Sequence, residues 1–187
     1  MPPRRPLDAY YTPPAVARAC VAALPCLAGA TVLEPHAGGG SFVRALGSAG
    51  ALVTACDVNP AAPGLALAQS SWVGDFLGYQ PPAAPAWVIG NPPYCAAESH
   101  VRHALQVTGR HVVYLLRLAF LESIRRAPLW RAHPPRRVWV LSARPSFTGG
   151  GTDSAAYGWM WWDAEHRGPP TLGWLDWSAQ GDQLELW

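Results

Sequence analysis

The chain has 187 residues, of which 50% are hydrophobic and 14% are charged, with a formal net charge of +2. This composition excludes a largely disordered chain, and the length predicts one domain with a substantial buried core. The small net charge does not by itself indicate a nucleic-acid partner.

Two further classes of protein are disfavoured by the sequence. The N-terminal segment has no apolar run typical of a signal peptide, and no run is long enough to cross a bilayer. We therefore expect a cytoplasmic protein without membrane association. The four cysteines form no CxxC pair and no Cys/His spacing typical of zinc, so no metal is expected.

In the first half of the chain, short apolar runs alternate with helical patterns and with glycine or proline turns. Helical spacing follows Pro13-Pro14, and another helix is expected after the glycines at 37–40. We predict helices at 15–24 and 65–68, and strands at 30–33, 51–56, 71–73 and 87–90.

The second half continues the alternation. We predict helices at 98–107 and 120–130, and strands at 111–116, 138–142 and 157–163, with a glycine-rich loop at 144–154. Strands that alternate with helices indicate an α/β fold, a doubly wound and largely parallel sheet. We interpret the tryptophans near the C-terminus as core or self-association residues.

Polar and glycine residues follow the predicted strands, at the edge where ligands bind in such sheets. Ala37 to Gly40 form the first strand-to-helix turn, and Asp57 ends the next strand, as expected of an acid that bonds ribose hydroxyls. Glu34, just before the turn, would oppose a pyrophosphate. The combination favours a nucleoside that carries an amino-acid sulfonium.

The segment Asn91-Pro92-Pro93-Tyr94 cannot continue the strand before it, because proline donates no hydrogen bond. The Asn91 side-chain oxygen and the Pro92 carbonyl can accept hydrogen bonds from an exocyclic amine that lies against Tyr94. These bonds draw the nitrogen toward tetrahedral geometry and release its lone pair for attack on a sulfonium methyl. The prolines hold both acceptors in place beforehand.

These motifs resemble those of the S-adenosylmethionine-dependent amino-methyltransferases, especially the N6-adenine DNA methyltransferases with the γ order of motifs. The matching segments are YYTPP at 10–14, LEPHAGGGSF at 33–42, CDVNP at 56–60, GDFL at 74–77 and GNPPY at 90–94. The resemblance covers about residues 8 to 163.

The resemblance implies a Rossmann-like methyltransferase sheet, mostly parallel with an antiparallel strand near the C-terminus, and S-adenosyl-L-methionine as cofactor. It implies catalytic roles for Asn91, Pro92, Pro93 and Tyr94, and contacts of Tyr94 and Phe147 with a flipped base. The cofactor-binding residues that it implies are Tyr11, Thr12, Pro13, Glu34, Pro35, Ala37, Gly38, Gly40, Asp57, Val58, Asp75, Phe76 and Asn91.

Several alternatives stay open. The leading substrate is adenine N6 in DNA; the others are adenine in RNA, glutamine N5 in a protein, or no substrate in a non-catalytic subunit. We expect one methyltransferase domain over 1–187 without a separate target-recognition domain, and therefore relaxed specificity, a homodimer or a separate specificity partner. We interpret four histidines as surface or hydrogen-bonded residues rather than catalytic ones: His36, His100, His103 and His111.

Overall fold

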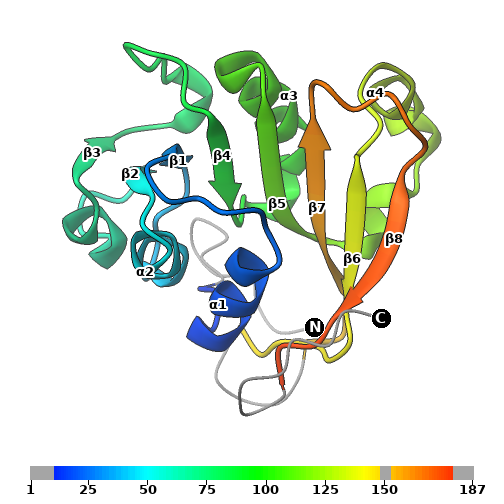
Figure 1. Ribbon diagram of the computed structural model, residues 1–187, viewed down its shortest axis with the longest axis horizontal. Coiled ribbons are helices and arrows are strands. Elements are labelled where there is room, and N and C mark those ends of the chain that lie inside the picture. Colours follow the sequence, from blue (N-terminus) through cyan, green and yellow to red (C-terminus); the bar gives the residue numbers. More distant parts are fainter. Residues whose placement is uncertain (1–10, 148–152, 179–187) are drawn as a thin grey trace.

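In the computed structural model, which describes residues 11–147 and 153–178, eight strands form one sheet in the order β3-β2-β1-β4-β5-β7-β6-β8 (Figure 1). The strands are β1 (Thr31–Glu34), β2 (Leu52–Asp57), β3 (Ser70–Val73), β4 (Trp87–Gly90), β5 (His111–Arg117), β6 (Arg137–Leu141), β7 (Tyr157–Asp163) and β8 (Thr171–Leu175). Strand β7 pairs antiparallel with both of its neighbours, and all other pairs are parallel. The predicted sheet, with its antiparallel strand near the C-terminus, is confirmed.

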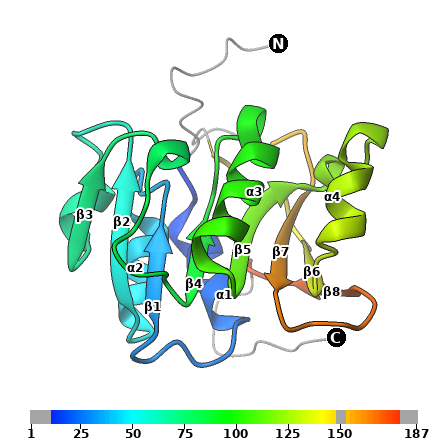
Figure 2. The same cartoon turned by 90° about the horizontal axis from the view of Figure 1, so that it is seen from above.

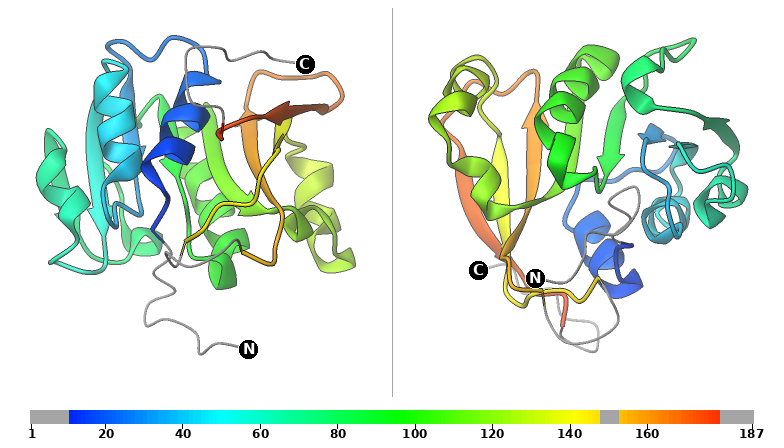
Figure 3. Two further views of the ribbon diagram at one scale, coloured as in Figure 1. Left: turned by 90° about the horizontal axis from the view of Figure 1, so that it is seen from below. Right: turned by 180° about the vertical axis from the view of Figure 1, so that it is seen from behind.

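Helices cover both faces of this sheet. One face carries α1 (Pro14–Ala22) and α2 (Ser41–Ser48), and the other carries α3 (Ala97–Thr108) and α4 (Ala127–Ala132) (Figures 2 and 3). The short 3-10 helices are Pro63–Leu67, Phe76–Gly78, Tyr94–Ala96, Leu118–Leu121 and Ile124–Arg126. In the described ranges, no helix is long and apolar enough to cross a bilayer.

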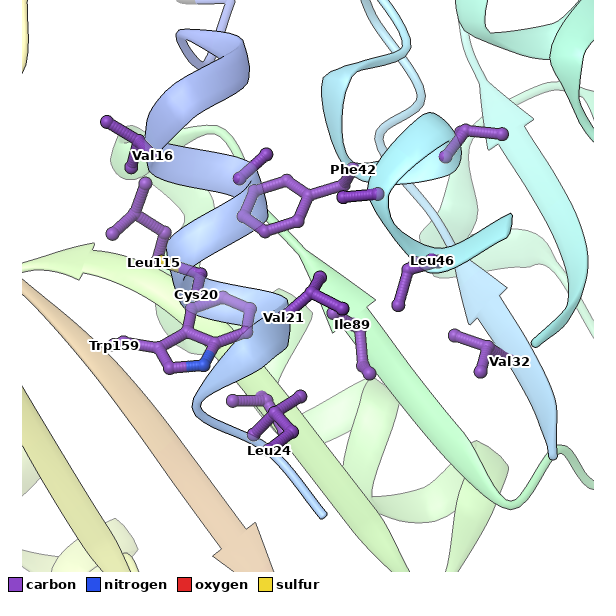
Figure 4. Close-up of a cluster of buried hydrophobic side chains, with 14 of the residues drawn as sticks. Val16, Cys20, Val21, Leu24, Val32, Phe42, Leu46, Ile89, Leu115 and Trp159 are labelled. Carbon is purple, nitrogen blue, oxygen red and sulfur yellow. The ribbon is translucent and has the colours of Figure 1, made fainter. Parts of the chain in front are cut away.

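The core on the α1 and α2 face is built from small helical residues and large strand residues. Cys20 of α1 and Leu46 of α2 are fully buried, as are Ile89 of β4 and Trp159 of β7. Phe42 lies stacked on Trp159, with ring centroids 5.3 Å apart and 9° between the planes (Figure 4). The aromatic pair thus packs α2, from the first half of the chain, against β7, from the second half.

The predicted helix at 120–130 is wrong. The segment instead contains two 3-10 turns and the short helix α4. Ser123 has φ 137°, which a right-handed helix cannot accommodate. Pro128 lies in the first turn of α4, the position where proline is compatible with a helix, so a new helix begins there.

Strand β8 is not among the predicted strands. It pairs parallel with β6 at the edge of the sheet, where Trp174 is 52% exposed and Leu175 is 1% exposed. Gly173, in the middle of the strand, interrupts the alternation of side chains by which a strand is recognised in the sequence. A Cβ at Gly173 would lie 3.2 Å from the Arg137 guanidinium, so the glycine makes room for a side chain of β6.

The sheet reverses its winding between β1 and β4. Strand β2 follows on one side of β1 and β5 on the other side of β4, while β1 and β4 pair directly. In open α/β sheets this reversal leaves a crevice beyond the carboxyl ends of the two strands. Glu34 ends β1 and Gly90 ends β4, so the NPPY segment begins at this point.

Candidate active site

A cavity of about 240 Å³ opens beyond the carboxyl ends of β1, β2 and β4. It is lined by Tyr11, Pro35, His36, Gly38, Asp57, Val58, Asn59, Asp75, Phe76, Asn91, Pro92, Pro93, Tyr94 and His100. A smaller cavity of about 30 Å³ beside it adds Thr12, Glu34, Ala37, Gly39, Gly40, Ser41 and Phe42 to the lining. The structure therefore brings together most of the residues predicted for the cofactor. Pro13 lines neither cavity and lies directly before α1.

The glycine turn is tied to the end of β2 by Asp57. One oxygen of its carboxylate accepts a hydrogen bond from the Gly38 N–H at 2.7 Å, and the other accepts one from the Asn59 N–H at 2.8 Å. Gly40 has φ 83°, which favours glycine, and is the N-cap of α2. A Cβ at Gly38 would lie 3.0 Å from the ring of Tyr11, so the turn needs glycine for close approach as well.

Glu34 is a buried carboxyl group at the floor of the smaller cavity. It is 1% exposed, and it accepts a hydrogen bond from the His36 N–H at 2.8 Å. A Cβ at Gly90 would collide with its carboxyl oxygen, so the neighbouring strand leaves room for this side chain. Burial raises the pKa of Glu34 to about 8, and the charge of Asp57 adds to the increase. A cation in this cavity would favour the ionised carboxylate.

This raised pKa predicts an unusual dependence of stability on pH. The folded state holds a proton on Glu34 up to about pH 8, whereas a glutamate in the unfolded chain releases it near its ordinary pKa of 4.5. The folded state thus binds more protons between these values, and the Glu34 contribution to the free energy of unfolding falls as pH rises from about 5 to 8.

Glu34→Gln removes this contribution, so the difference in melting temperature between the variant and the native chain should change steadily across that range. Comparison with the variant is needed because His36 and His100 also make stability depend on pH. Burial lowers the pKa of both, so their contributions to the free energy of unfolding rise with pH, opposite to that of Glu34. A difference that is constant from pH 5 to 8 would contradict the prediction.

Asn91 is oriented by the segment that precedes α1. Its amide nitrogen donates to the Thr12 hydroxyl at 3.1 Å, and the Ser41 hydroxyl donates to the Thr12 carbonyl at 2.6 Å. Thr12 is 8% exposed, and both hydrogen bonds of this connection are partly buried. The side-chain acceptor of Asn91 is then its oxygen, and the residue lines both cavities.

Tyr94 lies among aromatic and cationic side chains. The Arg117 guanidinium is 5.1 Å from the centre of its ring, and the Tyr157 ring is 5.6 Å away. The Tyr157 hydroxyl accepts a hydrogen bond from Arg117 at 3.4 Å and donates one to Asp153 at 2.7 Å. Burial raises the pKa of Tyr94 well above its ordinary value, so its hydroxyl stays protonated.

Phe147, predicted to contact a flipped base, is 5% exposed and belongs to the core on the α1 and α2 face. Its ring meets Tyr94 edge to face at 6.4 Å and lies 4.9 Å from Tyr157. In this structure Phe147 packs against the Tyr94 ring from within the core, and its contact with a base stays a prediction. Residues 148–152 of the predicted glycine-rich loop lie outside the described residues.

The histidine pair His36 and His100 belongs to the cavity wall. The His36 Nε2 and His100 Nδ1 atoms are 2.7 Å apart, which makes a hydrogen bond between the rings. Burial lowers the pKa of His36, and it lowers that of His100 to about 4, so both are neutral at pH 7. They are hydrogen-bonded, as interpreted from the sequence, but their position on the cavity was not predicted. Their only sequence signal is that His36 lies within the motif at 33–42 and that His100 follows the motif at 90–94 by six residues.

At the other end of the cavity, Asp75 and Phe76 follow β3. The Asp75 carboxylate accepts a hydrogen bond from the Leu77 N–H at 3.0 Å, and Phe76 is 2% exposed. Val58, after β2, is 49% exposed and lines the same cavity. Among residues 11–147 and 153–178, no three His, Cys, Asp or Glu side chains gather as metal ligands.

No family model and no curated protein sequence matches the chain. Solved structures do match it. The "putative RNA methyltransferase PH1948" from Pyrococcus horikoshii superposes with a TM-score of 0.70 at 15% identity, over 86% of this chain and 90% of that chain. The 23S rRNA methyltransferase ErmE gives 0.60 at 17% identity, over 83% and 68% of the two chains. Magnesium protoporphyrin IX methyltransferase from Synechocystis, with bound S-adenosylmethionine, gives 0.58 at 15% identity, over 80% and 77%. The chain therefore has the Rossmann-like methyltransferase fold.

Proposed function

We propose that the chain transfers a methyl group from S-adenosylmethionine to the exocyclic N6 of adenine in DNA. The observation that carries the proposal is the position of Asn91. It follows β4 at the reversal point of the sheet, donates to Thr12, and lines a cavity together with the glycine turn and Asp57. An amide acceptor, two prolines and a tyrosine at that point suit an amine substrate.

The cavity offers a separate group for each part of the cofactor. The glycine turn and Glu34 suit the amino-acid part, because the buried carboxyl group favours an ammonium ion. Asp57 suits the ribose hydroxyls, and Val58, Asp75 and Phe76 suit the adenine. The methyl group would then face Asn91.

In the proposed reaction, the Asn91 oxygen and the Pro92 carbonyl accept hydrogen bonds from the adenine amino group. The nitrogen lone pair attacks the methyl carbon, an N–C bond forms and the S–C bond breaks, and the sulfonium becomes a neutral thioether. The methylated nitrogen is acidic and releases one proton to solvent. Tyr94 packs against the base, and Pro92 and Pro93 hold the acceptors rigidly.

Adenine in RNA is the second candidate. It is favoured by the likeness to structures named as RNA methyltransferases, one of them an rRNA enzyme. The fold and the NPPY chemistry are compatible with either polynucleotide, since both present the same exocyclic amine.

The proposal is tested by incubating the purified chain with S-adenosylmethionine labelled on its methyl group and with separate pools of DNA, RNA and protein. We expect label in DNA, at adenine. Label in RNA adenine alone would replace the proposed substrate with the second candidate. Label in glutamine, or in none of the pools, would refute adenine methylation.

A further inference from the structure

A strained turn after β5 presents an apolar side chain to solvent. Ser123 has φ 137°, outside the regions that residues other than glycine normally occupy, so its backbone is strained. The next residue, Ile124, is 95% exposed. A single exposed apolar side chain is common on protein surfaces, but this one follows a strained residue, and strained backbone clusters at functional sites.

The turn is held in place by a dedicated arginine. The Arg126 guanidinium donates to the carbonyls of Ala119 at 3.2 Å and Phe120 at 2.9 Å, and to that of Glu122. It also lies 4.9 Å from the centre of the Phe120 ring, which is 6% exposed. The Ser123 carbonyl accepts from the Arg126 N–H at 3.1 Å. The exposure of Ile124 is thus a built feature of the turn.

The turn lies beside the candidate active site. It starts directly after Arg117, whose guanidinium covers Tyr94. Arg125 reaches the first turn of α3, where its guanidinium is 3.7 Å from the Glu98 carboxylate, and α3 follows the NPPY segment. Arg117 and Arg125, which make these two contacts, precede and follow Ile124 in the chain. In Figure 2 the segment before α4 lies on the same side of the sheet as the start of α3.

Arginines of the second half of the chain differ in exposure and in their contacts, and Arg136 lies at the edge of the sheet opposite the cavity, beside Asp163 at the end of β7. Arg126 is occupied by its own turn, and Arg136 donates to Asp163 at 2.6 Å and lies over Trp161. The Arg125 side chain, next to Ile124, is 86% exposed even with its guanidinium 3.7 Å from the Glu98 carboxylate. An exposed isoleucine beside an exposed arginine combines an apolar group for a base stack with a cation for a phosphate.

We propose that Ile124 is a wedge that enters the base stack of the nucleic acid when the target adenine leaves it. This inference rests on the proposed function, because a base in a duplex must leave the stack to reach Asn91. Unstacking is unfavourable, and apolar side chains inserted between bases replace the lost contacts. Arg125 would contact a phosphate of the same duplex.

The test compares duplex and single-stranded forms of whichever polynucleotide the native chain methylates. We expect Ile124→Ala to lower kcat/KM on the duplex by about tenfold or more, as a loss of roughly 1.4 kcal/mol would do. Activity on the single strand should be unchanged, because a target base that leaves a single strand does not leave a gap in a duplex stack for a side chain to fill. Ile124→Leu should retain activity on both. Leu172→Ala, at the far edge strand β8 and 60% exposed, is the matched control and should not change either activity.

Fluorescence of 2-aminopurine at the target position gives a second readout, and Ile124→Ala should reduce its increase on binding. Native activity on the duplex in Ile124→Ala would overturn the wedge and leave the proposed function intact. An equal loss on duplex and single strand would also overturn it, since that pattern indicates a damaged site. If the native chain itself methylates no nucleic acid, the proposed function fails and the wedge fails with it.

Discussion

Asn91→Ala is expected to reduce methyl transfer by at least about 10²–10³-fold, the range seen when one preorganised polar group of an active site is removed. The amide oxygen acts on the target amine, so its loss affects the chemical step. Cofactor affinity should be largely retained, because the glycine turn is held by Asp57 and not by Asn91. Single-turnover transfer and titration calorimetry with S-adenosylmethionine measure the two quantities separately.

Two further variants separate orientation from chemistry at this position. Thr12→Val removes the hydroxyl that accepts from the Asn91 amide at 3.1 Å and leaves Asn91 itself in place. Its rate should fall less than that of Asn91→Ala. Asn91→Asp keeps an acceptor oxygen and should also retain more activity. Native transfer rates in Asn91→Ala would contradict the role assigned to the amide.

Trp159→Ala should lower the free energy of unfolding by about 3–5 kcal/mol, as truncation of a large buried aromatic does. Trp159 is fully buried, lies in the middle of β7, and stacks on Phe42 of α2 (Figure 4). Its loss would leave a cavity between β7 and the helices. Denaturant unfolding followed by circular dichroism measures the change.

Trp174→Ala is the matched control, because Trp174 also lies in a strand but is 52% exposed. Its effect should be within about 1 kcal/mol. Trp159→Phe keeps a stacked ring, so its loss of free energy of unfolding should be smaller than that of Trp159→Ala. The variant also removes the Trp159 indole N–H, which is buried without a hydrogen-bond partner among the described residues. Equal stability of the two alanine variants would show that the stack on Phe42 is not central to the core.

The parts of the site that the sequence reveals are those tied to strand ends. Glu34, Asp57 and Asn91 each lie at or just after a short apolar run, and parallel strands bring such positions to one edge of the sheet. Glycine and proline mark the turns between them. These local signals predicted the strands of the sheet apart from β8 and placed these three residues at one edge, whereas most of the other cavity residues were implied by the resemblance.

Features that depend on tertiary contacts were not predictable. His36 and His100 are 64 positions apart in the chain, and nothing in the residues near them shows that their rings are hydrogen-bonded to each other in the cavity wall. The helix expected at 120–130 is broken at Ser123, where the Arg126 guanidinium binds the preceding carbonyls. Helical spacing of apolar residues cannot reveal such a side-chain contact with the backbone.

The identity of the methylated atom tests the central claim most directly. DNA treated with the native chain and labelled S-adenosylmethionine is digested to nucleosides and resolved by liquid chromatography with mass spectrometry, and DNA treated with Asn91→Ala serves as the control. We expect label in N6-methyl-2′-deoxyadenosine from the native reaction and its near absence from the control. Label in another nucleoside, or equal label from both proteins, would contradict it.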